Sequence, residues 1–114
     1  MKLKPGVRLH GIVPQIVFAA FVAEQCYQKR GLECVITSAN DGVHSPNSLH
    51  HSKRGKYSDG LCRAIDLRTR YTELNGLEIG LVNELRDRLG PDFDVLLEGV
   101  ATPNEHIHIE WDPK

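Results

Sequence analysis

The stretch Leu61-Cys62-Arg63-Ala64-Ile65-Asp66-Leu67 decides the fold, because it has the apolar and β-branched character of a buried strand and yet contains a carboxylate. Further along the chain, residues 76–89 carry leucine at every fourth position and end at Gly90-Pro91, a pattern typical of an amphipathic helix. Residues 93–97 and 106–111 predict two more strands. The C-terminal half is therefore expected to fold as strand, helix, strand, strand.

The N-terminal half predicts one helix and one strand, followed by a long loop. Pro14 suits an early helical position and Gly31 a stop, which predicts a helix over about residues 13–30. A strand follows at residues 32–37, and residues 38–59 are polar enough to form a long surface loop. This order of elements, without regular β-α-β alternation, predicts a single α+β domain over residues 1–114, with a small antiparallel sheet and flanking helices.

Composition excludes several functions. The formal net charge of -1 gives no bulk attraction to nucleic acid. Residues 12–23 form the longest apolar stretch, which is shorter than the ~20 residues of a membrane span, and no secretory signal follows Met1. Because Cys26, Cys34 and Cys62 are odd in number and widely spaced, we expect buried thiols rather than disulfides. We therefore expect a monomer made in the cytoplasm that binds neither nucleic acid nor membrane.

Histidines gather in two short segments, one around His50 and one at His106 and His108. Residues two apart on a strand point to the same face, so His106 and His108 project together, with Glu110 beside them on a regular strand. Such a pair can serve a metal or can simply be exposed on an edge strand. The pattern alone leaves both interpretations open.

The position of Asp66 in the sequence favours the metal-site interpretation of these histidines. Asp66 faces away from Ile65 and Leu67, and a partly buried carboxylate is costly unless it is paired or binds a cation. A salt bridge to a neighbouring arginine, Arg63 or Arg68, is the alternative. His50, Asp66 and His108 would make a three-ligand site, which leaves a position for water and suits catalytic zinc.

These segments resemble a known family, the zinc peptidases that include D-alanyl-D-alanine carboxypeptidases and phage L-alanyl-D-glutamate endopeptidases. The matching residues are Ser48-Leu49-His50, Ala64-Ile65-Asp66 and Glu105-His106-Ile107-His108, and the resemblance runs from about residue 35 to the C-terminus. It implies a fold like that of the hedgehog domain and these peptidases, Zn²⁺ on His50, Asp66 and His108, and peptidoglycan stem peptides as substrate. It also implies action at the bacterial cell wall, as a phage product such as an endolysin.

The resemblance further implies that Glu105 is the catalytic base, which requires a bend at Pro103-Asn104. On an unbent strand Glu110 is the rival. His106 would stabilise the oxyanion or orient substrate, or it is merely exposed. His44 and His51 are expected to be loop histidines.

The chain departs from the family pattern in three ways. His50 and Asp66 lie sixteen positions apart rather than seven, so residues 51–61 contain an insertion of about nine residues, and Cys62 replaces the motif glycine. The family's carboxylate-binding arginine after Thr37-Ser38 is missing. Its charge could come from other cationic residues, namely Lys53, Arg54, Lys56 and Arg63.

Two rival functions remain open. One is a catalytically inactive metal-binding module of a phage structure or of cell-wall recognition, which the insertion and the missing arginine favour. The other is a thiol hydrolase built on Cys62, for which no oriented triad is evident.

Overall fold

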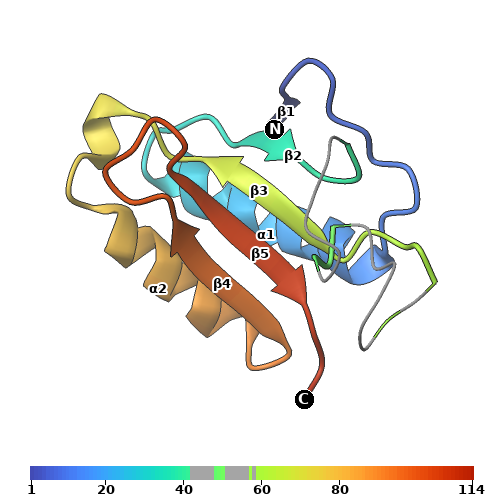
Figure 1. Ribbon diagram of the computed structural model, residues 1–114. Coiled ribbons are helices and arrows are strands. Elements are labelled where there is room, and N and C mark those ends of the chain that lie inside the picture. The colour runs from blue at the N-terminus through green and yellow to red at the C-terminus, as the bar shows by residue number, and fades with distance from the viewer. Residues whose placement is uncertain (42–47, 51–56, 58) are drawn as a thin grey trace.

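The computed structural model describes residues 1–41, 48–50, 57 and 59–114, and within them five strands form one sheet in the order β1-β2-β3-β5-β4 (Figure 1). The strands are β1 (Lys2–Leu3), β2 (Val35–Ser38), β3 (Ala64–Arg68), β4 (Phe93–Glu98) and β5 (His106–Trp111). All neighbours pair antiparallel except β1 and β2, which run parallel. The predicted α+β class is confirmed, but the sheet is mixed rather than wholly antiparallel.

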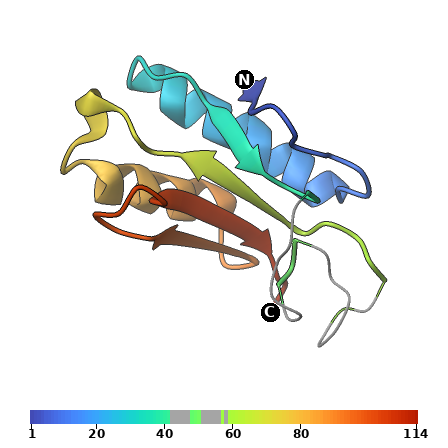
Figure 2. The ribbon, with the colours of Figure 1, turned by 45° about the horizontal axis from the view of Figure 1, so that its top comes forward.

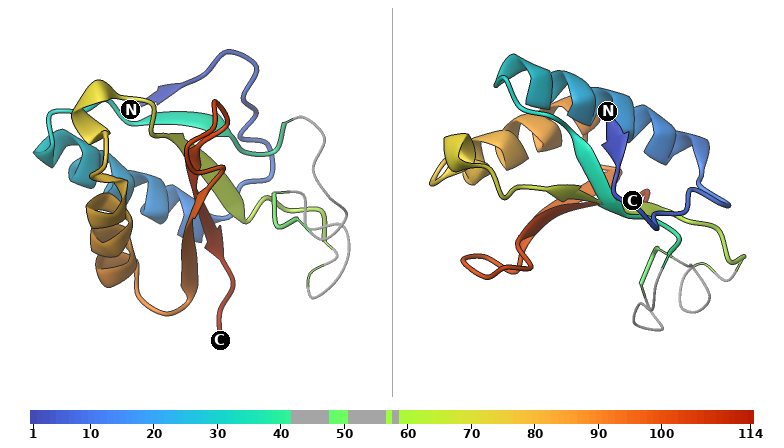
Figure 3. Two further views of the ribbon diagram at one scale, coloured as in Figure 1. Left: turned by 60° about the vertical axis from the view of Figure 1, so that its left-hand side comes forward. Right: turned by 90° about the horizontal axis from the view of Figure 1, so that it is seen from above.

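Two helices, α1 (Pro14–Lys29) and α2 (Glu78–Leu89), cover one face of this sheet. Seen from above, both helices lie on the same side and leave the other face uncovered (Figure 3). A short turn of 3₁₀ helix, η1 (Thr72–Leu74), joins β3 to α2. The described residues therefore form two layers, and among them no helix lies on the second face of the sheet.

Helix α1 forms where the sequence predicts it. Its buried residues recur at helical spacing, from Ile16 through Ala23 to Tyr27, and face the sheet. Gly31 adopts φ +70°, while the amides of Gly31 and Leu32 bond to the carbonyls of Gln28 and Tyr27. This is the Schellman ending that glycine favours.

Helix α2 packs beside α1 through Leu81, Val82, Leu85 and Leu89 (Figure 2). The predicted leucine repeat was wrong at its first member. Leu77 precedes the helix as its N-cap and is 62% exposed, so the buried side of the helix begins at Leu81.

The core lies between the helices and the inward-facing strand residues, of which Ile65, Leu67, Ile107 and Ile109 are fully buried. Cys26, Cys34 and Cys62 are buried free thiols, as predicted. None of the helices in the described residues is long and apolar enough to cross a membrane.

Candidate metal centre

The register of β3 against β5 sets up the centre. Asp66 pairs directly with His108, and Arg68 pairs with His106. Directly opposed residues of an antiparallel pair share a face, and because Ile65, Leu67, Ile107 and Ile109 face the core, the polar residues between them face the open side. Alternation alone therefore puts a carboxylate and two imidazoles together on the open face.

His50 reaches this face from residues 48–50. Its amide donates to Ser48 Oγ at 3.2 Å, and Leu49 O accepts the amide of Arg63 at 2.7 Å, which ties the segment to the start of β3. The side chain is almost fully buried, with 2% of the residue exposed. These local bonds give Ser48 of the motif a structural role, because its hydroxyl fixes the backbone of the ligand residue.

Of the three residues expected to bind metal, His50 and His108 both contact the carboxylate of the third, Asp66. Asp66 Oδ1 lies 3.3 Å from His50 Nε2 and 2.9 Å from His108 Nδ1, and the two rings are 5.2 Å apart at their centroids. Two atoms bound to one tetrahedral zinc at ~2.0–2.1 Å stand about 3.3 Å apart. The His50–Asp66–His108 grouping can therefore hold a metal ion at nearly this spacing.

The ring nitrogens that face away from Asp66 determine the protonation of the nitrogens that face it. His50 Nδ1 lies 2.7 Å from Ala39 O, and His108 Nε2 lies 2.8 Å from Glu110 Oε1. A carbonyl and a carboxylate can only accept, so each of these nitrogens carries a proton. The neutral rings then turn unprotonated nitrogens toward Asp66, the arrangement that outer hydrogen bonds give to metal-binding histidines.

Without a cation the same geometry requires extra protons. Burial is the largest single effect and lowers the pKa of His50, but the hydrogen bonds to Asp66, Cys62 and Ala39 and the charge of Asp66 together outweigh it and raise the pKa to about 10. The same balance raises the pKa of His108 to about 9. Burial raises the pKa of Asp66, yet hydrogen bonds to His108 and His50 hold that pKa well below its usual range. Positive charge is therefore required here, whether from protons or from a metal.

The two arginines that could have paired with Asp66, Arg63 and Arg68, form no salt bridge with it among the described residues. Arg63 makes a two-pronged salt bridge to Asp59, with both N–O distances at 2.8 Å. Arg68 lines the cavity described below, and the recorded ion pairs of Asp66 are with His50, His106 and His108.

Glu105 lies next to β5, and its carboxylate is held at the rim of the sheet. It accepts from Thr69 Oγ1 at 2.8 Å and from the Ala101 amide at 3.2 Å. Among the described residues, its recorded hydrogen bonds reach none of the three metal-binding candidates. The residue nevertheless lines the cavity above them.

Two other carboxylates stand closer to the histidines. Glu110, the rival base in the sequence, accepts from His108 Nε2 and so orients that ring. Glu98 on β4 was missed in the sequence: its Oε1 lies 3.0 Å from His106 Nε2 and 4.0 Å from His108 Nδ1. The register of β4 against β5 puts Glu98 opposite His106. Pairing residues 93–97 and 106–111 as a hairpin is the signal that could have found it.

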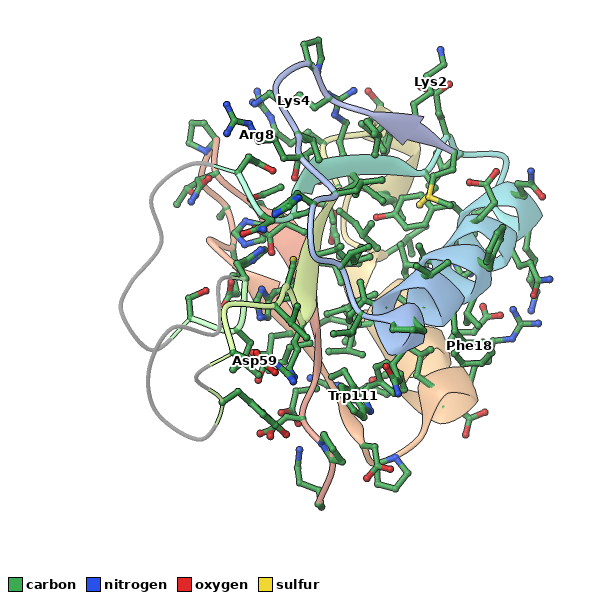
Figure 4. All side chains as sticks on the ribbon, turned by 90° about the vertical axis from the view of Figure 1, so that its right-hand side faces the viewer. Lys2, Lys4, Arg8, Phe18, Asp59 and Trp111 are labelled. Carbon is green, nitrogen blue, oxygen red and sulfur yellow. The ribbon has the colours of Figure 1, made fainter. Side chains whose placement is uncertain are left out.

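A hollow of about 740 Å³ opens over these groups, and the cations that line it differ from those expected. They are Lys4, Arg68 and Arg70. Of the expected substitutes for the missing arginine, Arg63 is bound to Asp59, while Lys53, Arg54 and Lys56 lie outside the described residues, as do His44 and His51. In Figure 4, Lys4 lies just after β1 near the top of the view, and Asp59 lies lower, toward the C-terminal strand.

Cys62 does not have access to this hollow. It is fully buried, and its thiol donates to Ala64 O at 3.2 Å. A nucleophile must reach its substrate, so the thiol-hydrolase alternative lacks the required exposure.

No model of a known protein family, no curated protein and no solved structure matches the chain.

Proposed function

We propose that this protein is a zinc metallopeptidase that hydrolyses a peptide bond in peptidoglycan stem peptides. The observation that carries the proposal is the meeting of His50 Nε2 and His108 Nδ1 on one oxygen of Asp66, with both outer nitrogens already engaged. Two imidazoles and one carboxylate make a site that keeps a position for water, the composition of catalytic rather than structural zinc.

The chain's own residues supply the remaining roles. When bound, zinc lowers the pKa of its water to about 7 and polarises the scissile carbonyl. Glu105 takes the water proton and passes it to the leaving amine, with Thr69 and Ala101 orienting its carboxylate at the cavity wall. His106 lines the same cavity and orients the substrate.

The positively charged side chains that line the cavity are evidence for an anionic substrate. Arg68 lies two residues after Asp66 on the open face, and Lys4 and Arg70 line the same hollow. A guanidinium binds a carboxylate with two parallel hydrogen bonds, and stem peptides carry free carboxylates. Arg68 thus takes the role of the family arginine that is missing after Ser38.

Arg68→Gln tests this subsite. We expect the KM for a soluble stem peptide to rise about tenfold or more with little change in kcat, because the contact is made in the ground and transition states alike. Arg88→Gln is the matched control, since Arg88 lies on α2 and contacts Gln25 and Cys26 on α1. A fall in kcat at constant KM would argue against carboxylate binding.

The inactive metal-binding module remains the second candidate, and the recorded bonds of Glu105 to Thr69 and Ala101 favour it. The deciding experiment compares zinc content and release of amines from purified peptidoglycan in the wild type and in Glu105→Gln. An active wild type with a zinc-loaded variant at least ~10²-fold slower supports the peptidase. A zinc-loaded but inert wild type supports the module.

A further inference from the structure

His106 repeats the arrangement of the two metal-binding candidates. Its Nδ1 lies 2.7 Å from Asn104 O, a carbonyl that can only accept, so this nitrogen carries the proton. Its Nε2 points toward two carboxylates, Glu98 Oε1 at 3.0 Å and Asp66 Oδ1 at 3.8 Å, and is the ring nitrogen left for a metal ion. Three imidazoles from two separate segments are therefore held in the tautomer that offers a lone pair to the same face.

Asp66, Glu98 and His106 also satisfy the spacing of a cation site. Each offers one ligand atom, and these atoms lie within 4.8 Å of one another. The imidazole and the two carboxylates are held by β3, β4 and β5, whose pairing fixes their separation. Like-charged carboxylates brought this close are costly without a cation between them.

A third group in the chain shows what an acidic cluster without a metal looks like. Asp94, Glu110 and Asp112 are similarly close. Lys114 Nζ lies 3.2 Å from both oxygens of Asp94 and 3.9 Å from Asp112 Oδ2, so that cluster already contains its own cation. Within the described part of the chain, the ion pairs of Glu98 and Asp66 are instead with histidines, which can release their protons to a metal ion.

We infer that Asp66, Glu98 and His106 bind a second divalent transition-metal ion, with Asp66 bridging it to the ion held by His50 and His108. This inference rests on the proposed function for its first ion. Sharing one carboxylate is compatible with two-metal hydrolase sites, whose ions stand ~3.5–4 Å apart. The pair would bind the attacking oxygen and the substrate carbonyl on separate ions.

The second ion is the weaker one. Its site has one imidazole and two carboxylates, and the Glu98 side chain is 46% exposed, compared with 10% for His108 and 3% for His50. Fewer nitrogen ligands suit zinc less and manganese relatively better. Titration of the metal-free protein with zinc should therefore show two steps.

The test counts ions per chain by mass spectrometry and by calorimetric titration with ZnCl₂ after chelator treatment. We expect two ions in the wild type, and one in Glu98→Gln and in His106→Gln, each with the tight step retained. Asp94→Asn is the matched control and should keep two, because its carboxylate belongs to the Lys114 cluster. A circular dichroism spectrum checks that each variant folds.

The outcomes separate the second ion from the first. A wild type that saturates at one ion overturns the second site and leaves the proposed peptidase standing, as does a Glu98→Gln variant that keeps two. A wild type that binds none overturns both. Crystals soaked in zinc give an independent readout: a second anomalous peak between Glu98 and His106 is expected, and a single peak at His50 and His108 contradicts the inference.

Discussion

At the scale of single residues, the protonation of His50 and His108 would govern metal binding at the proposed centre. Their pKa values of about 10 and about 9 mean that both rings are cationic in the metal-free protein at neutral pH. Zinc binds only the neutral ring, so protons must leave as the ion enters. We expect up to two protons released per zinc ion near pH 7. Calorimetry in buffers of different ionisation enthalpy measures this number, and a value of zero would contradict the assigned ligands.

The same shifts predict how the metal-free protein responds to pH. The folded pKa values of both histidines exceed the unfolded value of ~6.5, so their stabilisation is complete below that pH. It is lost as pH rises through about 9 and about 10. Thermal melts with chelator should therefore show Tm falling between neutral and alkaline pH. His108→Gln should flatten that decline, and an unchanged slope would refute the ion pairs as its cause.

The grouping of His50, Asp66 and His108 could be predicted from sequence motifs, whereas the place of Glu98 beside His106 needs the pairing of two strands. His50, Asp66 and His108 belong to short motifs whose order along the chain already suggests a metal. Glu98 ends a strand of ordinary composition and gains its role only because β4 pairs with β5. Its position depends on register, which is a property of two strands and is invisible in either one alone.

At the scale of elements, the described end of the 51–61 insertion is fastened to the C-terminal strand. Arg63 lies over the Tyr57 ring at 4.1 Å and over Trp111 at 5.9 Å, and it pairs with Asp59. Tyr57 also donates to Asp112 Oδ1 at 3.1 Å. Figure 4 shows Asp59 and Trp111, which this cluster joins. The rest of the insertion before Asp59, residues 51–56 and 58, lies outside the described residues.

Arg63→Ala should lower the free energy of unfolding by about 2 kcal/mol, since a mostly buried guanidinium loses charged hydrogen bonds and two ring contacts. Asp59→Asn should cost less, because that carboxylate is 44% exposed and solvent screens the pair. Urea unfolding of both variants measures the difference. Equal losses would show that the salt bridge, rather than stacking on the rings, holds the insertion.

The long elements were predicted well because hydrophobic periodicity governs them. The predicted helix at 13–30 is α1 (Pro14–Lys29), and the strand at 106–111 is β5 without change. β1 was not predicted, because two exposed residues carry no pattern and form a strand only by pairing with β2. The predicted strand at 32–37 begins later, at Val35, because the chain is still leaving α1 at Leu32, whose amide bonds to Tyr27 O.

At the scale of the whole molecule, the metal centre joins parts of the fold that are distant in sequence. His50 comes from the segment after β2, Asp66 from β3 and His108 from β5. The order β1-β2-β3-β5-β4 that brings them together does not follow from the order of elements, because local patterns do not specify which strands become neighbours. A cation that binds all three residues therefore stabilises long-range pairing as well as its own ligands.

Removing the metal should consequently lower the stability of the whole domain. A ligand present at 100 times its Kd adds about 2.7 kcal/mol to the folded state, which for a chain of this size raises Tm by roughly 10 °C. We expect chelator to lower the Tm of the zinc-loaded wild type by this amount and to leave Asp66→Asn unaffected. Differential scanning calorimetry measures both. If chelator strips the zinc and Tm does not move, the ion is bound at the surface and does not connect the three segments.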